Sequence, residues 1–216
     1  MHTFFHSEEF VKLEGEFPLL RRAREQFLGL RGIPGVIVDI ETTGLEPAQS
    51  EITEVAALKT EKGEIVDVFS ALIRIKGEVP PEIVKLTGIT KQMLDEAGEE
   101  KPQVLHKFFS FIEDRPLIAH NVDFDIPFLT HHLYKSFGKT LSNRTICTLK
   151  LSRKLLPALH SHKLGKVAEH FGIATPLTHR ATGDVEITHQ LWLRLINLLE
   201  RDGVHNLEEL LKLTPA

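Results

Sequence analysis

Two carboxylates, Asp39 and Glu41, stand two residues apart in the otherwise apolar run 35–41. On a β-strand, residues i and i+2 project from the same face, so the two side chains would lie side by side. Such a pair repels itself and resists burial, and it persists most easily when a cation lies between its oxygens. Oxygen ligands suit hard ions such as Mg²⁺ or Mn²⁺. An edge strand with both acids in solvent is the alternative, and the pair alone does not decide.

Two further acid clusters follow in the chain. The segment His120–Asp125 comes after the short apolar run 116–119 and opens a predicted helix, and His179–Asp184 opens the last long predicted helix. An acid in the first turn of a helix is commonly a cap or a partner of the helix dipole. Each cluster taken alone is therefore explained as readily by helix capping as by chemistry.

The combination of the three clusters carries more weight than any one of them. A layered α/β fold can bring strand ends and helix starts together at one edge of a sheet. Four carboxylates could then hold two divalent ions, which stabilise the attacking and leaving oxygens of a phosphoryl displacement. A neutral histidine beside them could take a proton from the attacking water. The acids concerned are Asp39, Glu41, Asp123, Asp125 and Asp184, and His179 is the histidine that precedes the last of them.

The elements that must position these residues can be predicted from hydrophobic periodicity and turn signals. Strand-like runs cover 35–41, 51–60, 64–75 and 116–119, with a hairpin signal at 61–63. Helices are predicted after Pro80 and over 102–113, 124–137, 148–156, 163–171, 180–200 and 207–213. Three strands, then helices, a strand and more helices indicate a mixed sheet flanked by helices, which is an α/β layered fold.

Length and composition favour a soluble protein with one main domain. The chain has 216 residues, of which 42% are hydrophobic and 26% charged. No apolar stretch approaches the ~18 residues that span a bilayer, and the first residues lack a signal-peptide pattern. A single cysteine, Cys147, excludes an internal disulfide and fits a reducing compartment. We therefore expect a cytoplasmic protein without a membrane partner.

Charge is distributed unevenly along the chain. The net charge of −4 argues against tight, nonspecific binding of nucleic acid. However, the segment 126–168 contains no Asp or Glu, and it carries Lys135, His131 and His132 among its basic residues. One face of the protein could therefore be basic, although a solvated helical surface is the simpler explanation for a charge run taken alone.

The three motifs resemble those of the DnaQ-like (DEDD) 3′→5′ exonucleases, which have a ribonuclease H-like fold. Val38–Gly44, His120–Asp125 and His179–Asp184 resemble the family's first, second and third motifs, in this order. The segment Pro80–Ile89 is similar to the connecting segment of proofreading subunits of bacterial DNA polymerase III. The resemblance covers residues 34–200 and implies a mixed five-stranded sheet flanked by helices. A sister group has Tyr four residues before its last Asp, but the one tyrosine, Tyr134, precedes Gly138 by four residues, so only the histidine form fits.

The resemblance implies a role for each matching residue. Asp39 would bridge two Mg²⁺ or Mn²⁺ ions, and Glu41 and Asp184 would complete the site of the nucleophilic water. Asp125 would serve the second ion on the leaving-group side, and His179 would be the general base. The turn after the first motif would contact the terminal nucleotide, with Leu45 as a wedge. The implied substrate-binding residues are Thr42, Thr43, Gly44 and Leu45, followed by Glu82, Thr87, His120, Asn121 and Phe124.

The resemblance predicts an exonuclease domain at 33–200, and apolar spacing predicts a helical extension at 1–32 and a helical C-terminal tail at 201–216. The expected substrate is the 3′ end of single-stranded DNA, in replication proofreading or repair, with a replicative DNA polymerase subunit as a possible partner. Two alternatives stay open: an RNA-trimming exoribonuclease of the same family, and a catalytically silent polymerase-binding module.

Overall fold

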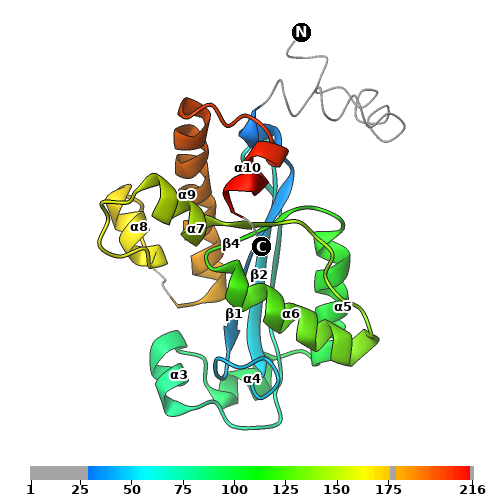
Figure 1. Cartoon of the computed structure of the whole chain (residues 1–216). Helices are drawn as coiled ribbons and strands as arrows, with labels where there is room; N and C mark the ends of the chain where they lie inside the picture. The colour runs from blue at the N-terminus through cyan, green and yellow to red at the C-terminus, as the bar shows by residue number, and fades with distance from the viewer. Residues whose placement is uncertain (1–28, 176–178, 215–216) are drawn as a thin grey trace.

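The computed structural model describes residues 29–175 and 179–214. Its centre is a five-stranded sheet with the strand order β3-β2-β1-β4-β5 (Figure 1). β1 pairs antiparallel with β2 and parallel with β4, β2 pairs antiparallel with β3, and β4 pairs parallel with β5. The strands are β1 (Gly35–Thr42), β2 (Ile52–Glu61), β3 (Glu64–Leu72), β4 (Leu117–Ala119) and β5 (Thr145–Cys147). The predicted mixed sheet is confirmed.

The hairpin between β2 and β3 has the turn that its sequence predicts. Glu61 pairs with Glu64, so only Lys62 and Gly63 form the loop, and both have positive φ, 55° and 81°. Positive φ at both central residues is the geometry whose twist matches that of the flanking strands. A buried histidine of a facing helix, His189, hydrogen-bonds through Nε2 to the Gly63 carbonyl at 2.9 Å, which ties this turn to the helical layer.

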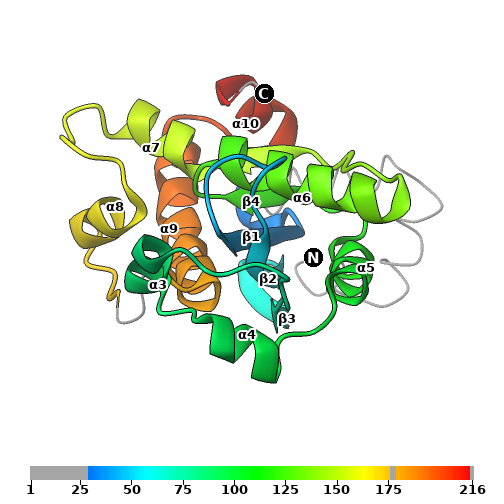
Figure 2. The same ribbon diagram turned by 90° about the horizontal axis from the view of Figure 1, so that it is seen from below.

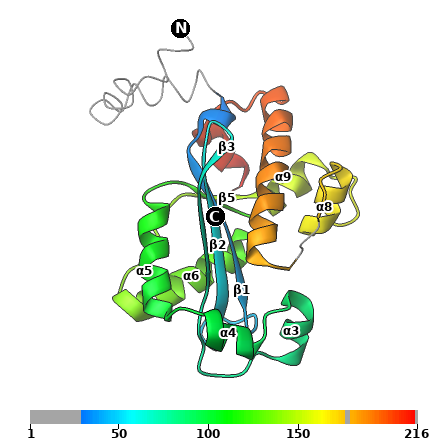
Figure 3. The same ribbon diagram turned by 180° about the vertical axis from the view of Figure 1, so that it is seen from behind.

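Helices cover both faces of the sheet (Figure 3). One face packs against the long C-terminal helix α9, and the other packs against α5 and α6. The helical elements are η2 (Leu30–Gly32, a 3₁₀ turn), α3 (Pro81–Thr87), α4 (Lys91–Ala97), α5 (Lys101–Ile112), α6 (Val122–Phe137), α7 (Thr148–Leu155), α8 (Leu164–His170), α9 (Ala181–Arg201) and α10 (Leu207–Leu213). None of the helices in the described ranges is long and apolar enough to cross a membrane.

Side-chain alternation along β1 decides which face carries the acids. Val36, Val38 and Ile40 belong to the core under α5 and α6, whereas Ile37 belongs to the core under α9. Because successive side chains alternate between faces, Asp39 and Glu41 share the face of Ile37 and lie toward α9. The apolar half of β1 is thus buried on both sides, while its last residues present carboxylates.

The first and last elements within the described residues pack onto the main hydrophobic core. Leu30 of η2 and Leu207 and Leu210 of α10 belong to the same cluster as the buried face of α9. Trp192 is 4% exposed there, so its large aromatic surface serves the core. Residues 1–28, which hold most of the predicted helical extension, lie outside the described residues, and the predicted division into extension, domain and tail stays a prediction.

Two short elements were not anticipated from the residue pattern. α4 is a two-turn helix whose N-cap Thr90 accepts a hydrogen bond from the Met93 N–H at 3.2 Å. β5 has only three residues, too few for a periodicity signal. With α3, α4 packs a small separate apolar cluster around Ile89 and Leu94. The two helices lie at one end of the sheet, which Figure 2 shows from below.

Candidate active site

The carboxylates of Asp39, Glu41 and Asp184 converge at the carboxyl end of β1. One oxygen from each lies within 4.8 Å of the others. Asp39 and Glu41 come from one face of β1, and Asp184 comes from the first turn of α9, which packs on this face. Residues 145 positions apart in the sequence are thus brought into one cluster, with all three side chains partly exposed.

The fourth predicted carboxylate, Asp125, reaches the same region from the other side. It is 3% exposed in the first turn of α6, which begins after Asn121 in a left-handed conformation with φ 98°. Burial raises the pKa of Asp125 to about 7. Hydrogen bonds from the backbone N–H groups of Asp125 itself and of Ile40, which lies between the two acids of β1, act in the opposite direction and offset part of this rise.

The cluster carries more negative charge than its surroundings stabilise. Burial and then the charges of Asp125, Asp184 and Glu41 raise the pKa of Asp39 well above its usual value. Burial and then Asp184 raise the pKa of Glu41 to about 8, and burial also raises the pKa of Asp184. Carboxylates that repel one another in a desolvated site are a donor set for a hard divalent cation, since a cation would replace the protons that otherwise neutralise them.

A fifth acid, Glu54 of β2, lies opposite Glu41 in the strand register but serves a different purpose. Its side chain is 2% exposed and forms a bidentate ion pair with Arg180, with Oε2 3.1 Å from Nε and Oε1 2.9 Å from Nη2. Oε2 also accepts the Ala181 N–H at 2.9 Å. Because Arg180, the N-cap residue of α9, makes no side-chain cap of its own, Glu54 supplies the cap from a distant strand. We call this unit the Glu54–Arg180 clasp.

Neither residue of the clasp was predicted from the sequence. A signal was present, because Glu54 is an isolated charge within the apolar run of β2 and so required a buried partner. The partner could not be identified without the fold, since Arg180 lies 126 positions away. Arg180 also lowers the pKa of Glu41 through its charge, which offsets part of the repulsion within the cluster.

His179 stands directly before the clasp, at the rim of the acid cluster. It is exposed and has a left-handed backbone with φ 64°, which is uncommon for a residue with a side chain. Its backbone N–H lies 3.3 Å from Asp184 Oδ2 and lowers the pKa of that carboxyl. The histidine therefore sits between Asp184 and the clasp, where the backbone leaves its ring in solvent.

The turn after β1 presents an exposed apolar side chain. Thr42 Oγ1 donates to the Gly44 carbonyl at 2.6 Å, and Thr43 is bound to Glu51 twice, through its N–H and its Oγ1, each at 2.9 Å. Leu45, at the tip of this rigid turn, is 78% exposed, the largest value among the exposed large hydrophobic residues of the described chain. An apolar group held so far into solvent is available to contact a ligand.

The remaining predicted binding residues differ in whether their polar atoms already have partners within the protein. Glu82 is exposed in the first turn of α3, whereas Thr87 is buried, with Oγ1 bonded to the Ile83 carbonyl at 2.9 Å. Both ring nitrogens of His120 are engaged within the protein, Nδ1 with Thr148 Oγ1 at 3.0 Å and Nε2 with the His162 carbonyl at 2.8 Å. Asn121 begins α6, and the half-buried ring of Phe124 lies 5.0 Å from that of Phe128. Their contacts with substrate stay predictions.

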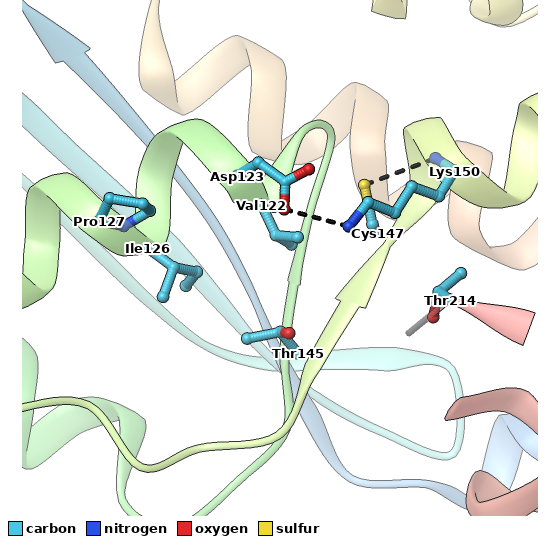
Figure 4. Close-up of a pocket in the computed structure, with 8 residues that line it drawn as sticks. All are labelled: Val122, Asp123, Ile126, Pro127, Thr145, Cys147, Lys150 and Thr214. Atoms are coloured by element: carbon cyan, nitrogen blue, oxygen red, sulfur yellow. Dashed lines mark hydrogen bonds and ion pairs between the residues drawn. The ribbon is translucent and has the colours of Figure 1, made fainter. Parts of the chain in front are cut away.

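A small pocket near the start of α6 contains none of the predicted metal ligands (Figure 4). It measures about 170 Å³, and the ion pair between Lys150 Nζ and Asp123 Oδ1, 3.1 Å long, lies beside it. Cys147 lines it as a buried free thiol whose Sγ accepts the Lys150 N–H at 3.5 Å. Cys147 therefore acts as a small buried residue that caps α7.

Comparison with solved structures supports this fold. Exonuclease X in complex with 5′ overhanging duplex DNA superposes with a TM-score of 0.63, at 26% identity over 83% of this chain and 98% of that one. E. coli Exonuclease I in complex with a dT13 oligonucleotide gives a TM-score of 0.71 at 21% identity, over 79% of this chain and 42% of that one. The second likeness shows the fold alone, a ribonuclease H-like mixed sheet, as the resemblance implied.

The chain is also similar in sequence to two DNA polymerase III proteins. The chain is 36% identical to the DNA polymerase III subunit epsilon of Aquifex aeolicus, over 76% of this chain and 81% of the relative. It is 37% identical to the DNA polymerase III PolC-type of Thermotoga maritima over 82% of this chain, which is only 13% of that much longer protein. The profile of the RNase T family, described as an exonuclease, matches residues 36–192. This match covers all three acid clusters and most of the chain, and the protein therefore belongs to the RNase T/DnaQ-like exonuclease family.

Proposed function

We propose that the protein is a divalent-metal-dependent 3′→5′ exonuclease that removes nucleotides from the 3′ ends of single-stranded DNA. The observation that carries this proposal is the convergence of four carboxylates whose pKa values are all raised, three of them with oxygens within 4.8 Å. Such a cluster destabilises a protein that binds no cation, because the carboxylates repel one another in a desolvated site. Membership of a family of metal-dependent nucleases explains why the cluster is kept.

The donor set fits two Mg²⁺ or Mn²⁺ ions, because all its ligands are carboxylate oxygens. Asp39 would serve both ions, as the resemblance of the first motif implies. Glu41 and Asp184 would complete one site, and Asp125 would complete the other. Ions held there would supply charge stabilisation for the attacking and leaving oxygens of a phosphodiester.

His179 is proposed as the general base that takes a proton from the attacking water. Its ring is exposed at the rim of the cluster, and its backbone is held by Asp184 and the following clasp residue. A histidine is suited to this step because its ordinary pKa lies close to neutral pH. The Thr42–Leu45 turn would hold the terminal nucleotide, with Leu45 packing against its base.

Substitution within the second motif tests this assignment with an internal control. Asp125→Asn should abolish digestion of a DNA oligonucleotide in Mg²⁺ or Mn²⁺, as should Asp39→Ala, because each removes a metal ligand. Asp123→Asn lies two residues from Asp125 but faces solvent, so it should retain activity close to that of the unmodified protein. Full activity in Asp39→Ala would refute the site. The same result is expected if the chain is a silent binding module and the digestion comes from a contaminating nuclease.

DNA is preferred over RNA as the proposed substrate because two of the relatives are DNA polymerase III proteins. The same relatives support a place in replication proofreading, with a polymerase subunit as partner. Turnover of sequence-matched DNA and RNA oligonucleotides compares the two substrates directly, and faster RNA turnover would favour the RNA-trimming alternative. Co-purification with a replicative polymerase subunit tests the partner.

A further inference from the structure

A second cavity lies beside the loop that follows β1, away from the four carboxylates. It measures about 190 Å³ and lies between this loop, the start of α5 and the middle of α6. In Figure 2 the loop crosses α6 as seen from below. We call it the loop pocket; its lining residues are Pro47, Ala48, Gln49, Ser50, Glu51, Lys101, His131, His132, Lys135 and Ser136.

The loop pocket gathers basic side chains. Lys101 comes from α5, and His131, His132 and Lys135 come from the acid-free segment of α6. Burial and then the charge of Lys135 lower the pKa of Lys101. Burial, followed by the charges of Lys101 and His131, lowers the pKa of His132 to about 4. These groups therefore feel one another's charge across a shared space.

Only one carboxylate of the pocket lining opposes this charge. Glu51 forms an ion pair with Lys101. His132 is neutral near pH 7 and bonds through Nε2 to the Ser50 carbonyl at 3.1 Å. Lys135 forms no ion pair with any residue in the described ranges, and His131 has only the edge-on contact with the ring of His132. The pocket thus keeps an unneutralised lysine beside an open cavity.

The pocket is built into the same loop as the proposed nucleotide-binding turn. Glu51, which lines it, is joined to Thr43 by two hydrogen bonds: the Thr43 N–H donates to the Glu51 carbonyl, and the Glu51 N–H donates to Thr43 Oγ1. None of the four carboxylates lines the pocket, and a strand that extends past the acid cluster needs positive charge elsewhere on the surface to attract its phosphates. An ammonium group in a cavity of this size matches a phosphate group.

We propose that the loop pocket binds a phosphate group of the DNA strand upstream of the terminal nucleotide, with Lys135 as its main cationic contact and His131 beside it. This inference rests on the proposed exonuclease function. It gives the acid-free segment a purpose, because a contact outside the acid cluster would hold the strand while successive terminal nucleotides are removed. Free phosphate has the same chemistry as a backbone phosphate, and the experiment below distinguishes the two.

The test compares Lys135→Gln with Lys139→Gln. Lys139 lies just beyond the end of α6, outside the pocket, with its Nζ over the ring of Phe109. Two substrates are used: an oligo(dT) of about ten nucleotides, and the p-nitrophenyl ester of thymidine 5′-monophosphate, which fills only the terminal site. Lys135→Gln should raise the KM for the oligonucleotide about threefold to tenfold relative to the KM for the ester, the effect of one charge-assisted contact.

Salt dependence supplies a second measure. The slope of log KM against log salt for the oligonucleotide should become shallower by about 0.7 in Lys135→Gln, the value for one phosphate contact on a single strand. Lys139→Gln should change neither quantity. The inference is overturned if Lys135→Gln leaves the KM ratio and the salt slope unchanged. It is also overturned if the KM values for the ester and the oligonucleotide rise equally, because the loop itself would then be altered.

Calorimetric titration with inorganic phosphate completes the comparison. Saturable binding of phosphate to the unmodified protein that Lys135→Gln removes, without any loss of oligonucleotide affinity, would assign the pocket to a free anion and overturn the strand contact. If the unmodified protein hydrolyses neither substrate, the proposed function fails, which is a different outcome from failure of the pocket.

Discussion

Replacement of Arg180 by methionine tests the clasp that begins α9. Arg180 contributes two of the three hydrogen bonds that the Glu54 carboxylate accepts, and the third comes from the Ala181 N–H. Methionine keeps the length of the apolar stem and removes the guanidinium. The variant therefore leaves a carboxylate that is 2% exposed without its charge partner, next to a cluster of other acids.

The expected cost follows from this burial. Breaking a buried ion pair by removing one partner costs about 3–5 kcal/mol, because the remaining charge is desolvated and uncompensated. The side chain of Arg180 is itself 32% exposed, so water can reach part of the site, and we expect the lower end, about 3 kcal/mol. Adding Glu54→Gln removes the stranded charge while keeping an acceptor for Ala181. The double variant should therefore be more stable than Arg180→Met alone.

Urea denaturation at pH 7 with a metal chelator present measures these free energies of unfolding. The matched control is Arg144→Met, which breaks the pair with Glu208 whose side chains are 54% and 63% exposed, and which should cost less than about 1 kcal/mol. The reasoning is refuted if Arg180→Met costs no more than Arg144→Met, or if Glu54→Gln destabilises the Arg180→Met protein further.

Four other predictions concern the acid cluster and the turn. Glu41 and Asp125 have folded-state pKa values of about 8 and about 7, above their unfolded values near 4. The native protein therefore holds more protons than the unfolded chain between these pH values, and the melting temperature of the metal-free protein should fall from pH 5 to pH 8. A rise in melting temperature over this range would contradict the raised pKa values. Mn²⁺ should raise the melting temperature most at pH 8, and the gain should shrink at pH 5, where protons compete for the ligands. Asp125→Asn should stabilise the metal-free protein at pH 8 in thermal melts while abolishing activity, and equal or lower stability would count against charge repulsion at this residue. Leu45→Ala should leave the melting temperature unchanged and raise the KM for DNA, since the side chain is 78% exposed; an unchanged KM would remove Leu45 from the binding residues.

Much of the fold was predictable because its signals are local. The apolar run of β1, the two-residue turn at Lys62 and Gly63 and the long periodic helix α9 follow from alternation, turn chemistry and helical spacing. β5 and α4 escaped because three or seven residues carry too little pattern. Their positions depend on neighbours distant in the chain.

The candidate site divides in the same way. The identity of its acids could be read from the order and types of residues, because Asp39 and Glu41 on one strand must share a face whatever the rest of the chain does. That Asp184 lies within 4.8 Å of them, and that Asp125 bonds to the strand between them, was decided by the packing of α9 and α6 on opposite faces of the sheet.

Two features belong to the tertiary structure alone. The pairing of Glu54 with Arg180 and the meeting of Lys101 with Lys135 join residues from elements that no local pattern relates. Sequence by itself determined which charges the protein carries and on which strand or helix each sits. Only the folded chain decided which of them are desolvated together, because burial and proximity, which set the pKa values and the strength of each pair, exist only once the layers have packed.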